Sequence, residues 1–292
     1  MRHPPRRPLR RRRTPSKPVD RVGELAKRSL TGAAYVALTL GAAIIGPWTT
    51  FVLFLPVCLI AAAEWYRLTE QAEIHVHNAM ASMVLAGVAY AGIGLAPMLG
   101  GSVVPGLAVI LAMLVLYVFE LLRRGSASPG QALAHHLATV VYIALPFALV
   151  TWMVERHWHV FVGFMFLLWT SDTGAYLVGR SIGRTKLMPK VSPGKTWEGL
   201  AGGVALTMGV GWLLSRQWPE LSTAQWLVGA AAVAVTATLG DLLESAFKRA
   251  RGVKDSGTVL PGHGGILDRF DGYLLAAPAM VVVVALLEVL HF

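Results

Sequence analysis

The sequence predicts an all-α polytopic membrane protein with about nine transmembrane helices. Of its 292 residues, 55% are hydrophobic and only 14% are charged, whereas soluble domains have about 25% charged residues. The mean hydropathy is +0.57. Apolar stretches of about 20 residues, the length that crosses a bilayer as a helix, recur along the chain. The single cysteine, Cys58, leaves no intrachain disulfide and so says nothing about redox compartment.

The first 28 residues form a basic segment with 11 Lys/Arg and five prolines. Such a composition cannot bury a core, so residues 1–28 are predicted to be a disordered cytoplasmic tail. No aromatic residues lie between the arginines, which argues against nucleic-acid binding. We expect the tail to fix the orientation of the chain and to contact anionic lipid headgroups.

The predicted helices follow the tail without room for a soluble domain between them. Residues 29–155 are expected to be scaffold helices, and 156–292 catalytic helices with cytoplasmic loops at 180–199 and 248–271. The nine predicted spans are 29–47, 48–66, 79–98, 103–122, 135–154, 159–179, 200–215, 225–247 and 272–291.

The distribution of basic residues predicts the orientation. With the N-terminus in the cytoplasm, the tail and the cytoplasmic loops hold 24 of the 26 Lys/Arg, and only Arg156 and Arg216 fall outside them. Because cytoplasmic segments are enriched in Lys and Arg, this bias indicates a cytoplasmic N-terminus. An odd number of spans then places the C-terminus outside. Alanine- and valine-rich spans with a basic tail indicate a bacterial inner membrane.

Charged residues cluster at the cytoplasmic end of the eighth predicted span. Asp241, Glu244, Ser245 and Lys248 are spaced i, i+3, i+4 and i+7, which puts them on one helical face. Asp241 lies roughly 10 Å deeper than Lys248. Since charges inside a membrane are costly and usually functional, this face is a candidate site. A buried Asp–Lys pair that only helps helices to pack is the alternative.

Two further segments carry polar residues toward the same side. Asp172 lies near the end of the sixth span, in "WTSDTGAYLVGR". In "KVSPGKTWEGLAGG" we expect Pro193 and Gly194 to turn the chain and Thr196 or Ser192 to cap a helix. A helix N-terminus flanked by lysines binds anions readily, although a capped helix with surface lysines is a simpler interpretation.

The stretch "LPGHGGILDRFDGY" precedes the last span. Asp268 and Asp271 lie at the predicted start of a helix, where acids also act as partners of the helix dipole. That role explains neither Gly262, Gly264 and Gly265 nor the presence of His263 and Arg269. Acids from two helices beside several Lys/Arg suit a hard divalent ion that bridges a polyphosphate.

Zinc is not expected. The chain has one cysteine, and the pairs His75/His77 and His157/His159 lack other donors in the sequence. The residues alone therefore predict a membrane enzyme with a cytoplasm-facing Mg²⁺ site for phosphorylated substrates.

Residues 245–271, "SAFKRARGVKDSGTVLPGHGGILDRFD", closely resemble the signature of the phosphatidate cytidylyltransferases. "SPGKTWEG" and "WTSDTGAYLVGR" also resemble segments of this family. The positions that match the signature are Ser245, Lys248, Arg249, Lys254, Asp255, Gly257, Pro261, His263, Gly264, Gly265, Asp268, Arg269 and Asp271.

The resemblance implies the reaction of CTP with phosphatidic acid to give CDP-diacylglycerol and diphosphate. It further implies a nine-helix fold in the lipid bilayer, Mg²⁺ dependence with K⁺ as a second ion, and a homodimer. The metal ligands carry over onto Asp241 and Asp268, with Asp271 as a third candidate. Lys248, Arg249, Lys254 and Arg269 would then offset the negative charge of CTP and of the lipid phosphate. The other substrate-binding candidates are Ser192, Lys195, Thr196 and Ser245, which would supply hydrogen bonds to phosphate, and His263. Asp172, also a substrate-binding candidate, would orient these cations or join the metal shell.

Two other function classes remain as alternatives. A CTP-dependent lipid-alcohol kinase would transfer the γ-phosphate and release CDP. A secondary transporter would show inverted repeats and polar sites near mid-membrane, but the sequence has no clear repeat and the polar residues gather toward one face.

Overall fold

The computed structural model describes residues 21–69, 76–101, 104–124, 129–259 and 264–290. The described residues are helical except for one short β-hairpin and the loops that connect the elements. Its elements are α1 (Arg21–Ile45), α2 (Pro47–Thr69), α3 (Val76–Leu95), η1 (Pro97–Leu99), α4 (Val104–Arg124), α5 (Pro129–Ala138), η2 (Thr139–Ala144), α6 (Leu145–Arg156), α7 (Trp158–Ile182), β1 (Lys186–Met188), β2 (Ser192–Thr196), α8 (Trp197–Gln217), α9 (Thr223–Ala250) and α10 (Leu267–Val289).

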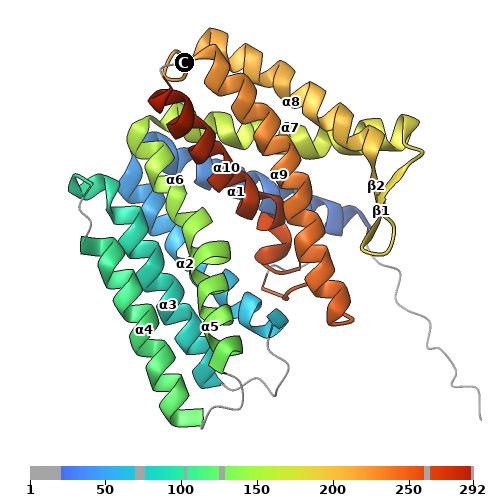
Figure 1. Ribbon diagram of the computed structural model, residues 1–292. Helices are drawn as coiled ribbons and strands as arrows, with labels where there is room; N and C mark the ends of the chain where they lie inside the picture. Colours follow the sequence, from blue (N-terminus) through green and yellow to red (C-terminus); the bar gives the residue numbers. More distant parts are fainter. Residues whose placement is uncertain (1–20, 70–75, 102–103, 125–128, 260–263, 291–292) are drawn as a thin grey trace, which may run out of the picture.

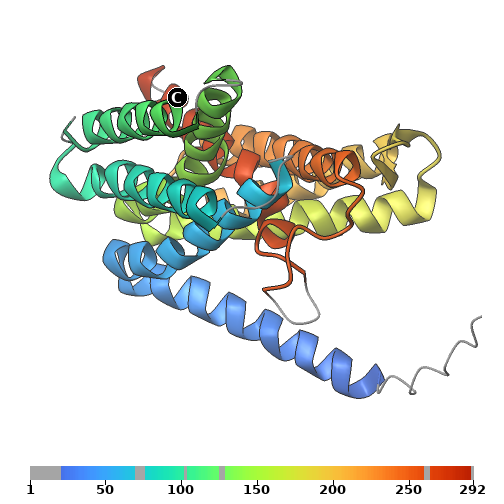
Figure 2. The ribbon, with the colours of Figure 1, turned by 90° about the horizontal axis from the view of Figure 1, so that it is seen from below.

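The helices form two groups that meet at α10 (Figure 1). Helices α2 to α6 pack together in one group, and α7, α8 and α9 in the other. Helix α10 packs along α9 and also contacts α6. Helix α1 contacts α2 and α7 and runs along one side of the bundle (Figure 2). The last helix therefore joins the scaffold half of the chain to the half that carries most of the charged motifs.

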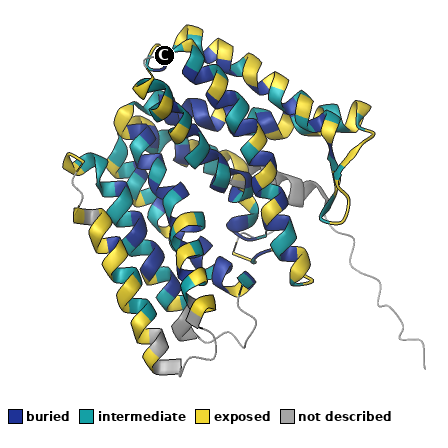
Figure 3. Ribbon diagram, viewed as in Figure 1, coloured by how far each residue is buried: buried dark blue, intermediate teal, exposed yellow. Residues whose placement is uncertain are grey.

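An aromatic cluster forms the core where these groups meet. Phe54 of α2 contacts Phe147 of α6, Phe161 of α7 and Phe270 of α10. Tyr273 stacks on Phe147 at 5.5 Å between ring centroids. Buried residues concentrate between the helices, whereas α4 and α8 show many exposed positions (Figure 3). Such large buried rings hold the two groups in a fixed relation.

Five helices are long and apolar enough to cross a membrane: Pro47–Thr69, Leu133–Arg156, Trp158–Ile182, Thr223–Ala250 and Leu267–Val289. Shorter apolar helices lie at Gly32–Ile45, Ala79–Leu95 and Gly106–Phe119. The all-α membrane class is thus confirmed. Each predicted span falls on a helical segment, but nine crossings and the orientation of the termini stay predictions.

The structure moves some predicted boundaries. Helix α1 begins at Arg21, inside the predicted tail, while residues 1–20 lie outside the described chain. The fifth predicted span contains the π-helical turn Thr139–Ala144. The turn predicted at Pro193 and Gly194 is wrong, since both lie in β2, which pairs antiparallel with β1. In a two-stranded hairpin each strand has a free edge, so proline's missing N–H is tolerated.

Candidate active site

Close packing of α9 on α10 brings acids from the two helices together. A Cβ atom on Gly240 would overlap the carbonyl oxygen of Asp271, and one on Gly272 would lie 3.1 Å from that of Ala237. Larger residues would push the helices apart. These two glycines therefore set the distance between the acids of α9 and those at the start of α10.

Asp241, Glu244 and Asp271 form what we call the carboxylate cluster. One oxygen from each lies within 4.8 Å of the others. Glu244 is almost fully buried, with 2% of its surface exposed. Three carboxylates this close repel one another unless cations or protons compensate their charge. The cluster is therefore a place where positive charge is needed.

Two lysines from different parts of the chain supply part of that charge. Lys195 Nζ lies 2.6 Å from Asp241 Oδ2. Lys248 Nζ lies 2.5 Å from Glu244 Oε2 and 2.7 Å from Asp268 Oδ1. Each lysine thus pairs with a different member of the cluster.

Asp268 organises the loop before α10. Its Oδ2 accepts hydrogen bonds from the backbone N–H groups of Ser256 and Gly265, both at 2.8 Å, and from the Ser256 hydroxyl at 3.0 Å. Its Oδ1 accepts from Lys248. Gly264 adopts φ +86° beside it, a conformation that favours glycine. The structure therefore brings Asp268 to the edge of the carboxylate cluster through Lys248.

Glu64 of α2 anchors the same loop from the scaffold half of the chain. Its Oε2 accepts a hydrogen bond from the Leu267 N–H at 2.9 Å and a longer one from the Ser256 hydroxyl at 3.4 Å. A Cβ atom on Gly257 would overlap Glu64 Oε1, and one on Gly265 would lie 2.6 Å from Oε2. The close approach of a buried carboxylate thus explains why glycine is needed at both positions of this loop.

Lys195 lies in β2, two residues before the start of α8, so the hydrogen bonds that hold the hairpin and this helix end also position Lys195. Thr196 Oγ1 accepts a hydrogen bond from Gly199 N–H at 3.1 Å, so Thr196 is the N-cap, one of the two residues predicted for this role. Glu198 in the first turn accepts from the backbone N–H groups of Arg184 and Thr185. A hydrogen bond from its own backbone N–H, together with these, lowers the pKa of Glu198 to about 2.

The remaining predicted residues lie at different depths. Ser245 donates to Asp241 Oδ1 at 3.2 Å. Asp172 is exposed but interacts electrostatically with Lys195 and Asp241. Ser192 is half-buried at the start of β2, and Arg249, Lys254 and Arg269 are exposed. His263 lies outside the described residues.

The carboxylate cluster fits a hard divalent cation. All its donors are carboxylate oxygens, which Mg²⁺ prefers. Glu244 Oε1 is buried and has no hydrogen-bond partner among the described residues, even though Oε2 pairs with Lys248. A buried carboxylate oxygen without a donor is costly, and a cation would satisfy it.

Two residues of the site, Glu244 and Glu64, were not predicted as such. Glu244 was expected on the polar face of the eighth span but not as a metal ligand, although its spacing from Asp241 puts the two carboxylates on one face. Glu64 falls within the predicted scaffold. Its signal is an acid inside an apolar run, "CLIAAAEWYRL", which is costly in a membrane and indicates function.

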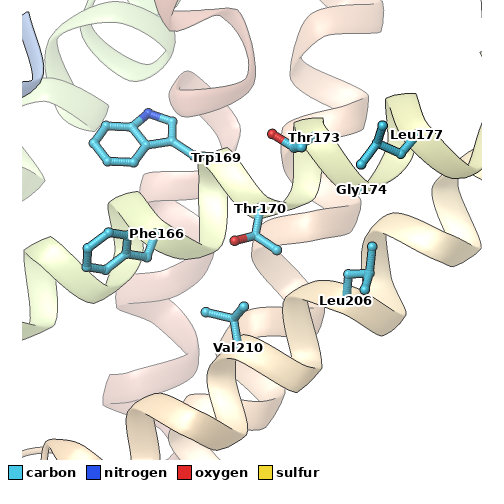
Figure 4. A pocket seen from close by; sticks show the side chains of 8 residues that line it. All are labelled: Phe166, Trp169, Thr170, Thr173, Gly174, Leu177, Leu206 and Val210. Carbon is cyan, nitrogen blue, oxygen red and sulfur yellow. The ribbon is translucent and has the colours of Figure 1, made fainter. Parts of the chain in front are cut away.

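A separate lateral pocket of about 290 Å³ opens between α7 and α8 (Figure 4). Its lining on α7 runs from Phe166 to Leu177, a stretch that includes Asp172, which is not itself a lining residue. Its lining is mostly apolar and consists of Phe166, Trp169, Thr170, Thr173, Gly174, Leu177, Leu206 and Val210.

Comparison with known proteins gives a consistent family assignment. The family model described as the cytidylyltransferase family matches residues 26–287. A phosphatidate cytidylyltransferase of Bacillus subtilis (strain 168) is 48% identical over 122 residues, which cover 41% of this chain and 45% of the relative.

Two staphylococcal relatives carry the same name. That of Staphylococcus saprophyticus is 39% identical and that of Staphylococcus aureus (strain COL) 40% identical, each over 146 residues, covering 49% of this chain and 56% of the relative. The chain thus aligns with about half the length of these curated relatives. Because the family model spans nearly all of the described helices, from α1 to α10, the chain belongs to the cytidylyltransferase family.

Proposed function

We propose that this chain is a phosphatidate cytidylyltransferase, which transfers CMP from CTP to phosphatidic acid. The observation that carries the proposal is the meeting of three carboxylates from α9 and α10 with Lys195 and Lys248, in a chain whose named relatives are phosphatidate cytidylyltransferases.

The proposed reaction is one in-line phosphoryl substitution. A phosphate oxygen of phosphatidate forms a bond to the α-phosphorus of CTP, and the bond from that phosphorus to the bridging oxygen of the β-phosphate breaks. CDP-diacylglycerol and diphosphate result. A phosphate nucleophile needs no strong base, so positioning and charge neutralisation dominate the catalysis.

The residues of this chain have distinct parts in that scheme. Lys195 and Lys248 would bind phosphate oxygens, since each lies within reach of the carboxylate cluster. Asp268 would hold Lys248 in place through their ion pair. The exposed residues Arg249 and Lys254 would attract the highly charged CTP from water.

Asp241, Glu244 and Asp271 would hold Mg²⁺, whose charge would offset that of the triphosphate. Asp268 is also proposed as a ligand. To bind the ion, its carboxylate would give up some of the hydrogen bonds that it now accepts. A K⁺ ion is proposed as a second cation on the family resemblance alone.

The pocket between α7 and α8 is a candidate for an acyl chain of the lipid substrate. Its apolar lining suits a hydrocarbon chain, and its lining residue Thr173 is the neighbour of Asp172 on α7. A lipid lying there would keep its chains at the membrane side while its phosphate reaches the polar end of the helices.

We also propose that the chain crosses a bacterial plasma membrane nine times, with the N-terminus and the active site facing the cytoplasm. The basic loops support it, because the positive-inside rule assigns them to that side. A homodimer is proposed from the family resemblance.

The test uses purified full-length protein and CTP labelled at either the α- or the γ-phosphate, with and without Mg²⁺. Phosphatidate is the lipid in one set of reactions and a lipid alcohol in a parallel set. We expect the α-label in the lipid product and the γ-label in diphosphate, only with Mg²⁺ present. Transfer of the γ-label to a lipid alcohol with release of CDP would instead establish the kinase. No transfer from CTP to any lipid would reject both.

A further inference from the structure

A second group of metal-binding side chains lies far from the carboxylate cluster. His157 and His159 at the start of α7 meet Glu220 from the loop between α8 and α9, with one donor atom of each within 4.8 Å of the others. From Thr223 to Asp241, helix α9 advances about 27 Å. This group, here called the histidine cluster, therefore lies at the other end of the bundle.

The donor atoms of the histidine cluster lie close together. His159 Nδ1 lies 2.6 Å and His157 Nδ1 lies 3.4 Å from Glu220 Oε1. Ligands about 2.0–2.2 Å from a tetrahedral ion lie about 3.3–3.5 Å apart. The His157 distance fits that value, and the His159 contact would have to open by less than about 1 Å.

The position of Glu220 is fixed by its surroundings. Ser222 and Gln225 form a capping box just after it. Trp226 Nε1 in α9 donates a hydrogen bond to the carbonyl oxygen of Trp218 at 3.2 Å, which ties the start of the α8–α9 loop to α9. The carboxylate is therefore presented to the histidines by a rigid turn.

The histidine rings are also held in place. The His159 ring stacks on Trp218, with 4.6 Å between ring centroids and 13° between planes. The rings of His157 and His159 lie 4.4 Å apart. A site whose ligands are oriented before binding loses little conformational entropy when an ion enters.

One atom of this group is not accounted for by hydrogen bonding. Glu220 Oε2 is buried and has no hydrogen-bond partner among the described residues. A hydrogen bond between His159 and Glu220 accounts for the position of Oε1 but not for the burial of Oε2.

We propose that His157, His159 and Glu220 form a binding site for a divalent transition-metal ion of the Zn²⁺ class, which joins the start of α7 to the α8–α9 loop. Two imidazoles and one carboxylate are a ligand set that suits zinc, with a fourth position left for water. His157 Nδ1 now accepts a hydrogen bond from His159 N–H at 3.2 Å. Binding through Nδ1 would replace that bond.

The test uses the full-length protein in detergent, purified without a polyhistidine tag and stripped with a chelator. Zn²⁺ binding is measured by equilibrium dialysis, and the visible absorption of added Co²⁺ reports the coordination geometry. We expect one ion per chain, intense tetrahedral Co²⁺ bands and a higher unfolding temperature with Zn²⁺.

Glu220→Gln and His159→Ala should each weaken Zn²⁺ binding by more than about tenfold, because loss of even an indirect partner has that effect at metal sites. Glu155→Gln is the matched control: it removes the same charge from an exposed position just before α7 and should bind like the wild type. The proposal is overturned if the wild-type protein binds no Zn²⁺, or if Glu220→Gln binds it as tightly as the wild type.

Discussion

The carboxylate cluster and the histidine cluster lie toward opposite ends of α9 and differ in their donors. The first has three carboxylates and two paired lysines. The second has two imidazoles and one carboxylate, with tryptophans around them. Oxygen donors beside cations suit Mg²⁺ and polyphosphate, whereas imidazoles suit a borderline ion such as Zn²⁺. The comparison shows how one helix bundle can hold two sites of different chemistry.

The largest expected difference between the clusters is in catalysis. Asp241→Ala removes a carboxylate and the ion-pair partner of Lys195, so we expect a loss of at least about 10³-fold in CDP-lipid formation, corresponding to several kcal/mol. His159→Ala should leave the rate within about twofold. Initial rates with labelled CTP check this, and full activity of Asp241→Ala would remove it from the proposed site.

Asp268→Ala tests the edge of the carboxylate cluster. The substitution removes one ion-pair partner of Lys248 and the carboxylate that accepts hydrogen bonds from the Ser256 N–H, the Ser256 hydroxyl and the Gly265 N–H. We expect activity to fall below detection while the protein stays folded in detergent. Size-exclusion chromatography and the unfolding temperature provide the folding control. An active Asp268→Ala variant would contradict both its structural and its proposed metal role.

A smaller effect is expected where the loop contacts Glu64. Gly265→Ala would place a Cβ atom 2.6 Å from Glu64 Oε2 and closer still to Ser256 Oγ, and such overpacking costs about 1–3 kcal/mol of stability. Gly209→Ala is the control, because a Cβ atom there would meet no other atom within 4 Å. Thermal unfolding should separate the two variants, and equal unfolding temperatures would reject this account of the loop.

The smallest effect concerns Glu198, which ties the hairpin to α8. Its pKa is lowered to about 2 from 4.5, so its contribution to stability is present above about pH 4.5 and is lost as the pH falls toward 2. At pH 7, Glu198→Gln should speed hydrogen exchange of the Arg184 and Thr185 amides severalfold. Unchanged exchange would show that the charge does not order this turn.

The features predicted correctly from the sequence are those that depend on the spacing of residues within one helix. The i, i+3, i+4, i+7 spacing put Asp241, Ser245 and Lys248 on one face, and the structure has contacts along it. The position before a helical run predicted Thr196 or Ser192 as the N-cap, and the structure has Thr196 in this role. The placement of the helices followed from apolar segments of fixed length.

What the sequence could not predict depends on contacts between distant segments. The approach of Lys195 to Asp241 spans β2 and α9. Glu64 meets Leu267 across 203 positions of the chain, and Glu220 meets His159 across 61. Because no periodicity encodes such pairs, the sequence did not predict the zinc-type donor set.

The most direct test of the central claim is the Mg²⁺ dependence of CDP-lipid synthesis in Glu244→Gln compared with Glu220→Gln. If Asp241, Glu244 and Asp271 hold the ion, Glu244→Gln should raise the half-saturating Mg²⁺ concentration by at least about tenfold. Glu220→Gln should match the wild type. An unchanged Mg²⁺ dependence in a folded, active Glu244→Gln variant would contradict the account.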